Sequence, residues 1–347
     1  MKRGFTHFIL RCLLAALPVA GLILAYVVAD PFRVIWPADD AIAQWGDSLQ
    51  VNINQGHVSA MNFMRYNGER HYDSFIMGSS MSQNYKASDW AAHLPAGASI
   101  YHFDAWRETL QGISDKLDFL EKQGTRVNNV LIVIEEEMLH RDADVNDFRF
   151  MGSPITSPDV GTLDFHWRFF KNCLSMDVIR FFLDPQGHAS QALSQGIVTR
   201  DVPSRIPELN ESYYAQFDSL IAVSPDAFFT PERLAQREIR AVPTVDGPQM
   251  YGLREQQARH LAEQLHRLGA HYIILVPPRY GRPTLCAYDR VVLAEIFGRD
   301  HVFDFSDHPT MSTDPRCFYD RDAHLISRCC KQLLDSCYST SISLHSR

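Results

Sequence analysis

Short apolar segments alternate with amphipathic helical segments along most of the chain, and this alternation constrains the fold more than any other feature. Asn129–Ile134 (NVLIVI) and His271–Val276 (HYIILV) are continuous apolar runs, typical of strands buried on both faces of a parallel sheet. Three further strands are predicted at Phe75–Gly78, Ser99–Phe103 and Val302–Phe305. Strands that alternate with helices predict an open α/β sheet covered by helices.

Four helices are predicted between and after these strands, because their apolar residues recur at helical spacing. They are Glu108–Gln123, Gly252–Leu268, Val291–Phe297 and His324–Cys337. Residues 140–245 interrupt the alternation and are interpreted as an insertion or cap. Their aromatic-rich stretch, Phe165–Phe182, is interpreted as a hydrophobic cap packed on the domain, with a sugar-stacking surface or a partner helix as alternatives.

The N-terminus has the pattern of a membrane anchor. Its basic residues are Lys2, Arg3 and Arg11. The uncharged run Cys12–Ala29 has 18 residues and can cross a hydrocarbon core of about 30 Å if Phe8–Leu10 contribute. A cleaved signal peptide is the alternative, because Val27-x-Ala29 fits a cleavage pattern. The basic residues favour a cytoplasmic N-terminus, so the main domain is expected in the periplasm or outside the cell.

The predicted organisation therefore has three parts. Residues 1–30 form a cytoplasmic tip and a transmembrane anchor, and residues 31–70 form a juxtamembrane linker with a helical segment. Residues 71–347 form an extracytoplasmic α/β domain that carries the insertion at about 140–245. A chain of 347 residues is long enough for a full hydrophobic core.

Composition argues against two classes of function. The net charge is −8 and no long run of Lys or Arg appears, so nucleic acid is not expected as a partner, because its binding requires a basic face. No Cys/His spacing typical of a zinc site appears, and no metal or cofactor is expected. Six cysteines lie outside the predicted span, and an oxidising compartment favours a bridge between the C-terminal segment and an upstream loop.

Two polar blocks are predicted to meet at one edge of the sheet. Sites in open α/β sheets lie at the carboxyl ends of the strands, where Gly78-Ser79-Ser80 follows the first strand and His324 follows the last. A serine becomes a nucleophile when a base takes its proton, and the base needs a carboxylate to orient it. Asp322 and Asp320 both precede the histidine. Helix capping is the alternative role for either serine and for Asp322.

Together, "MGSS" and "YDRDAH" resemble the SGNH/GDSL hydrolase superfamily, in which the nucleophile follows strand one in a Gly-x-Ser element. The acid and base of that superfamily share a late Asp-x-x-His element. The resemblance implies an SGNH-like three-layer α/β/α domain with Ser80 as nucleophile and His324 as base. Because position 321 is Arg, neither aspartate has the common offset. Asp-x-His resembles the variant in alginate O-acetylation proteins, which favours Asp322, with Asp320 as the alternative.

The wider layout resembles membrane-anchored SGNH-like proteins of cell-surface polysaccharide pathways, including alginate O-acetylation and teichoic acid D-alanine transfer proteins. Shared features are the basic N-terminus, the single anchor, "DPF" after it, "MGSSMSQNY" and "FYDRDAHL". The resemblance implies an acyltransferase or esterase on the inner membrane that acts on a surface polysaccharide or acyl donor. A multispanning membrane O-acyltransferase is the implied partner. A secreted lipase-like enzyme, released by signal cleavage, is a further alternative.

The middle blocks depart from the family pattern. SGNH enzymes place a Gly and an Asn as oxyanion donors, whereas the corresponding strand ends read "FDAWRE" and "IEEEML". Backbone N–H groups of Ser80, Trp106 or Arg107 are the remaining candidates, and Glu135–Glu137 adds negative charge unless it is a solvated strand end. These departures favour a non-catalytic glycan-binding or assembly factor as the alternative function. Weaker candidates for substrate binding are His140, His308 and Arg279, and Asp304 is interpreted as structural.

Overall fold

A computed structural model describes residues 2–36, 49–142, 147–200, 203–235, 247–281, 285–320 and 323–345. The chain divides into two compact units. The N-terminal unit comprises Met1–Ile53 and Gly161–Val202, and the sheet unit comprises Asn54–Val160 and Pro203–Arg347. The predicted boundaries at residues 70, 140 and 245 do not coincide with these units.

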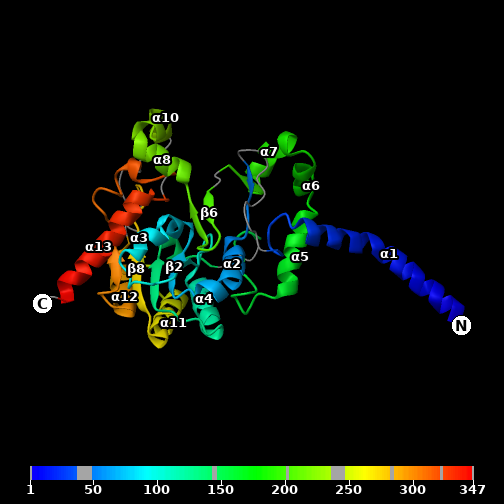
Figure 1. The fold of residues 1–347 in the computed structure, drawn as a ribbon, viewed down its shortest axis with the longest axis horizontal. Coiled ribbons are helices and arrows are strands. Elements are labelled where there is room, and N and C mark those ends of the chain that lie inside the picture. Colours follow the sequence, from blue (N-terminus) through cyan, green and yellow to red (C-terminus); the bar gives the residue numbers. More distant parts are fainter. Residues whose placement is uncertain are drawn as a thin grey trace. The chain divides into compact units, whose positions relative to one another are not determined.

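Five strands of the described residues form the central sheet, in the order β3-β2-β4-β8-β9. Strands β2 and β8 of this sheet are labelled in Figure 1. Every neighbouring pair is parallel. Their bounds are β2 Ser74–Gly78, β3 Ile100–His102, β4 Asn129–Val133, β8 His271–Val276 and β9 Val302–Asp304. The structure thus confirms the predicted α/β class with a parallel sheet. The chain leaves β2 to one side for β3 and then crosses to the other side for β4, so the strand order reverses between β2 and β4.

Successive strand residues point to opposite faces of the sheet and pack in two separate hydrophobic cores. Ile132 of β4 packs in one core and Leu131 in the other, and both are fully buried. Fully burying such a side chain contributes about 1.5–3 kcal/mol. Helices with residues in the first core are α2 Gln55–Arg70, α4 Leu110–Lys122, α11 Leu253–Leu268 and α12 Ala287–Phe297. Those with residues in the second are α3 Ala87–Ala91, α8 Ala215–Val223, α9 Pro225–Phe228 and α13 Ser327–His345.

The remaining elements of the sheet unit are short. They are the 3₁₀ helices η2 Ser80–Asn84, η3 Glu136–Leu139 and η4 Pro315–Cys317, the helix α10 Pro231–Ala235, and the antiparallel pair β6 Ser204–Ile206 and β7 Glu211–Tyr213. Helix α2, which falls in the predicted linker, belongs to this unit because Phe63 stacks on Phe103 of the sheet layer.

The N-terminal unit joins the apolar N-terminal helix to part of the aromatic-rich segment. Its elements are α1 Lys2–Ala29, β1 Gln50–Val51, α5 Thr162–Cys173, α6 Met176–Leu183, α7 Pro185–Ser194 and β5 Val198–Thr199. Among the described residues, one helix is long and apolar enough to span a membrane, at Leu10–Ala29 of α1. The Tyr26 hydroxyl bonds His166 Nδ1 at 3.2 Å, and the ring of Tyr26 meets Phe170 edge-on. The aromatic stretch therefore packs on the end of α1, and its role as a cap on the α/β domain stays a prediction.

All seven cysteines fall within the described residues, and each is a free thiol. The expected bridge from the C-terminal segment to an upstream loop is therefore not formed. Cys317, Cys329, Cys330 and Cys337 are instead buried side chains of the second core. Here cysteine packs as a small apolar residue.

Candidate active site

The turn after β2 requires a glycine. Gly78 has a φ of +150°, a conformation that residues with a Cβ rarely adopt. A Cβ at this position would lie 2.7 Å from the carbonyl oxygen of Val133 and 3.0 Å from Cβ of Ser82. Gly78 therefore lets the end of β2 lie against β4 before the chain turns.

The two serines after this glycine have different tasks. Ser79 is buried and caps η2, because its Oγ accepts a hydrogen bond from the backbone N–H of Met81 at 3.3 Å. Its carbonyl oxygen also accepts from the hydroxyl of Ser82 at 2.7 Å. Ser80 is the first residue of η2 and is partly exposed. Capping is thus done by Ser79, which leaves the hydroxyl of Ser80 for another partner.

The loop that carries His324 to this turn is fixed at its ends by backbone contacts. Phe318 and Leu325 form an isolated antiparallel bridge, and the backbone N–H of Ile326 donates to the carbonyl oxygen of Cys317 at 2.9 Å. All four side chains are buried. Inside this clamp, the backbone N–H of Tyr319 donates to the carbonyl oxygen of His324 at 2.8 Å. The loop from 319 to 324 is therefore held at both ends by the second core.

The structure brings Ser80, His324 and Asp320 into one chain of hydrogen bonds. Nε2 of His324 lies 2.9 Å from Oγ of Ser80, and Nδ1 lies 2.5 Å from Oδ2 of Asp320. The side chains of His324 and Asp320 are 32% and 41% exposed. A carboxylate can only accept, so Nδ1 carries a proton, and in the neutral ring Nε2 is left to accept one. This is the order of groups that a serine nucleophile needs.

The carboxylate that lies against Nδ1 of His324 is that of Asp320, the alternative acid of the sequence analysis, where Asp322 was favoured. Asp322 lies outside the described residues. The Oδ1 atom of Asp320 accepts the backbone N–H groups of Ala323 at 3.1 Å and His324 at 2.9 Å. These bonds hold the carboxylate of Asp320 against the backbone of Ala323 and His324, which places it next to the imidazole ring four residues later. The alternative aspartate of the sequence reading therefore occupies the position of the acid.

The pair is electrostatically coupled. Burial acts to raise the pKa of Asp320, but the hydrogen bonds and charge of His324 outweigh it and hold that pKa well below its usual range. Burial acts to lower the pKa of His324, but Asp320 outweighs it and raises the pKa, with a smaller contribution from Glu135 in the same direction. Arg279 opposes this rise. The negative charge of Asp320 and the positive charge of protonated His324 therefore stabilise each other.

Asp104, which follows β3, anchors the turn that carries Ser80. It is fully buried. Its carboxylate accepts hydrogen bonds from three amide side chains, those of Gln83 at 2.6 Å, Asn210 at 2.9 Å and Gln55 at 3.2 Å. The backbone N–H of Ala105 donates to the carbonyl oxygen of Gly78 at 3.2 Å. Within "FDAWRE", the carboxylate of Asp104 thus anchors η2 through Gln83. The sequence did not reveal this role.

The Glu135–Glu137 triplet after β4 is paired with arginines. Arg141 contacts Glu135 at 2.8 Å and Glu137 at 2.6 Å, and Arg279 contacts Glu137 at 2.6 Å. Burial would raise the pKa of Glu137, but the two guanidinium groups hold it below its usual range. Glu135 and Arg279 are largely buried, so the triplet is not a solvated strand end. No pattern in the sequence pointed to Arg141 as a partner of these glutamates.

The other sequence candidates make contacts separate from the hydrogen-bond chain of Ser80, His324 and Asp320, which is called the relay below. The ring of His308 accepts from the backbone N–H groups of its own turn, and His140 is exposed at the end of η3. Asp304 accepts from the backbone of Ser306 and pairs with Arg290 at 3.2 Å, in agreement with a structural role. Arg107 has a φ of +53° and lies over the ring of Phe150.

Within the described part of the chain, no group of three or more His, Cys, Asp or Glu side chains is placed to hold a metal ion. No protein family model matches the chain. No curated protein matches it significantly either. The functional assignment therefore depends on the geometry of the site.

Proposed function

We propose that this protein is a membrane-anchored SGNH-type acyltransferase or esterase that modifies a cell-surface polysaccharide outside the cytoplasm. The observation that carries the proposal is the chain of hydrogen bonds from Ser80 through His324 to Asp320. Three residues of these types, in this order and at these distances, are the parts of a serine acyl-transfer site.

In the proposed reaction, Oγ of Ser80 attacks the carbonyl carbon of an acyl donor while Nε2 of His324 takes its proton. The imidazolium then gives this proton to the leaving group, and the acyl group stays on the serine as an ester. A sugar hydroxyl or water attacks this ester, loses its proton to His324, and releases Ser80 as the proton returns. Asp320 stays ionised and stabilises the imidazolium, in agreement with its lowered pKa.

Two observations bear on the oxyanion that this reaction creates. Ser80 begins η2, so its backbone N–H has no acceptor within that helix and is our candidate donor. The negative charges of Glu135 and Glu137 are offset by Arg141 and Arg279. The sequence objection that this triplet would repel an oxyanion is therefore weakened.

The fold supports the proposal at a coarser level. Numbered along the chain, the five strands have the order 2-1-3-4-5, a doubly wound arrangement. Such sheets bind ligands beyond the carboxyl ends of the strands, where the strand order reverses. Here that point lies between β2 and β4, which end at Gly78 and Val133, just before Ser80 and Glu135.

The location outside the cytoplasm is also part of the proposal. It rests on α1 as an uncleaved anchor and on the basic residues at its N-terminal end, which favour a cytoplasmic N-terminus. A surface polysaccharide as acceptor and a multispanning membrane O-acyltransferase as partner follow from the resemblance stated above.

Turnover of p-nitrophenyl acetate by the full chain in detergent tests the proposal. We expect hydrolysis, and labelling by a serine-directed fluorophosphonate, that both vanish in Ser80→Ala. Ser79→Ala is the matched control, because it removes the neighbouring hydroxyl, whose role is to cap η2, and leaves Ser80 in place. Absence of both signals in the native protein would favour the alternative, a non-catalytic glycan-binding or assembly factor, to which the missing Gly and Asn point.

A further inference from the structure

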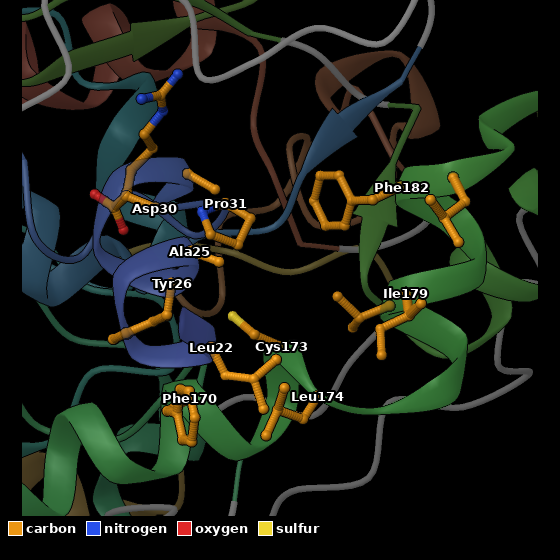
Figure 2. Close-up of a pocket in the computed structure, with 14 residues that line it drawn as sticks. Leu22, Ala25, Tyr26, Asp30, Pro31, Phe170, Cys173, Leu174, Ile179 and Phe182 are labelled. Carbon is orange, nitrogen blue, oxygen red and sulfur yellow. The ribbon is translucent and has the colours of Figure 1, made fainter. Parts of the chain in front are cut away.

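An apolar groove lies beside the end of the predicted membrane span. Its volume is about 480 Å³, and its lining comes from the end of α1 and from α5 and α6 (Figure 2). Leu22 and Ala25 of α1 face Leu174, Ile179 and Phe182 across it. The groove and all of its lining belong to the N-terminal unit.

The depth of the groove follows from the geometry of α1. The apolar segment Leu10–Ala29 has 20 residues and is therefore about 30 Å long, which matches the hydrocarbon thickness of a bilayer. Leu22 lies seven residues before Ala29, so it sits about 10 Å inside the end of the span. The same groove is also lined by Pro31, beyond the end of the span. If α1 spans a membrane, the groove therefore extends from the end of the span to the depth of Leu22.

Helix α5 has the surface needed for this position. Leu163, Trp167, Phe170 and Leu174 recur at spacings of four, three and four residues, which places them on one helical face. Leu163 is 88% exposed, and Trp167 and Leu174 are also exposed. Phe170 of this stripe is buried against Tyr26 of α1. Phe169, which points another way around the helix, is fully buried and its ring meets that of Phe32.

Helix α6 continues this surface. Met176 and Leu183 are both exposed, Leu183 at 81%. Isolated exposed apolar residues are normal, but a contiguous set rimmed by polar groups marks an interaction surface. The polar rim on α5 is formed by Asp164 and Arg168, which pair at 2.7 Å.

Two tryptophans mark the level of the membrane interface. The carboxylate of buried Asp30 accepts the backbone N–H groups of residues 34–36 and so folds the chain back at the end of α1. The indole N–H of Trp36 then donates to the carbonyl oxygen of Val27 at 2.7 Å, and about half of the side chain stays exposed. Trp167 is exposed on α5. Exposed tryptophans at the end of a span are typical of the headgroup level.

We propose that α5 and α6 lie in the outer part of the bilayer, and that the groove beside α1 holds an acyl chain of a membrane phospholipid. The inference rests on α1 being a membrane anchor and does not depend on the chemistry of Ser80. Continuity of the groove with the span selects a lipid as occupant, because lipid already surrounds α1 at the depth of Leu22.

Site-specific photocrosslinking of the full chain tests this placement. The photoreactive residue p-benzoylphenylalanine replaces Leu163 or Leu183 in protein reconstituted in phosphatidylcholine–phosphatidylglycerol vesicles that contain a tritiated phospholipid. The matched control replaces Asp164, which neighbours Leu163 but points about 100° away around the helix. A second control replaces Leu14, within the span and exposed.

We expect tritiated adducts from Leu163, Leu183 and Leu14, with labelling from Asp164 severalfold lower. Labelling from Leu14 but not from Leu163 and Leu183, or equal labelling from Asp164, would overturn the placement of α5 and α6. An adduct with the mass of a second protein chain at Leu183, which lines the groove, would identify a protein as the occupant and overturn the lipid assignment. Absence of labelling from Leu14 would overturn the premise that α1 spans the bilayer.

Discussion

Replacing Asp320 with asparagine removes the charge of the proposed triad acid and keeps its shape. The amide oxygen can still accept the backbone N–H groups of Ala323 and His324, so the turn persists. The amide NH₂ group then faces Nδ1 of His324 and forces the ring proton to Nε2, which can no longer accept from Ser80. The same change in a well-studied serine triad lowers kcat by about 10⁴. This loss corresponds to about 5 kcal/mol of transition-state stabilisation.

The pH dependence gives a second readout of the same variant. Only the neutral imidazole accepts a proton, so native activity should rise with pH through the pKa of His324, which lies above its ordinary value. Without the negative charge of Asp320 this pKa falls, and the rise moves to lower pH. Profiles of p-nitrophenyl acetate hydrolysis against pH measure both effects, with Asp322→Asn as the matched control. A larger loss of activity in Asp322→Asn than in Asp320→Asn would refute the assignment of the acid.

Three further predictions concern the residues that position the relay. Gly78→Ala should lower the free energy of unfolding by about 1–3 kcal/mol, because a strained φ adds to the clash with Val133; an unchanged denaturation midpoint would contradict this. Asp104→Ala leaves three amide donors without their acceptor, and each unsatisfied group costs about 1–3 kcal/mol. Its melting temperature should therefore fall more than that of Asp104→Asn, and the opposite order would count against the anchoring role. Arg279→Ala removes a positive charge that lowers the pKa of His324, so the rise of activity should move to higher pH, opposite to the shift in Asp320→Asn. No shift, or one to lower pH, would show that Arg279 does not act on His324.

The central sheet was predictable because its strands are short apolar runs with clear ends. The bounds of β8 agree with the predicted His271–Val276, since the run is continuous and Pro277 follows it. The position of Ser80 at the end of β2 follows from the same pattern. The bounds of β9 are shorter than predicted by one residue, within the usual uncertainty of element ends.

The identity of the acid could not be predicted, because it depends on how the backbone folds between residues 320 and 324. Offset rules taken from related motifs favoured Asp322, whereas the backbone N–H groups of Ala323 and His324 bind the carboxylate of Asp320. The pairing of Arg141 with Glu135 could not be predicted either. Arg141 lies in a loop, where no periodic pattern shows which way a side chain points. Contacts between Tyr26 and α5 join segments 140 residues apart, and no local rule links them.

Trapping the acyl group on the protein tests the central claim most directly. Native protein mixed with p-nitrophenyl acetate, quenched with acid within milliseconds and digested can be analysed by mass spectrometry for acetylated peptides. We predict acetylation on Ser80, a burst of p-nitrophenol that matches it, and loss of both in Ser80→Ala and His324→Ala. An acetyl group on Ser79, or acetylation of Ser80 that is unchanged in His324→Ala, would contradict the relay from Ser80 through His324 to Asp320.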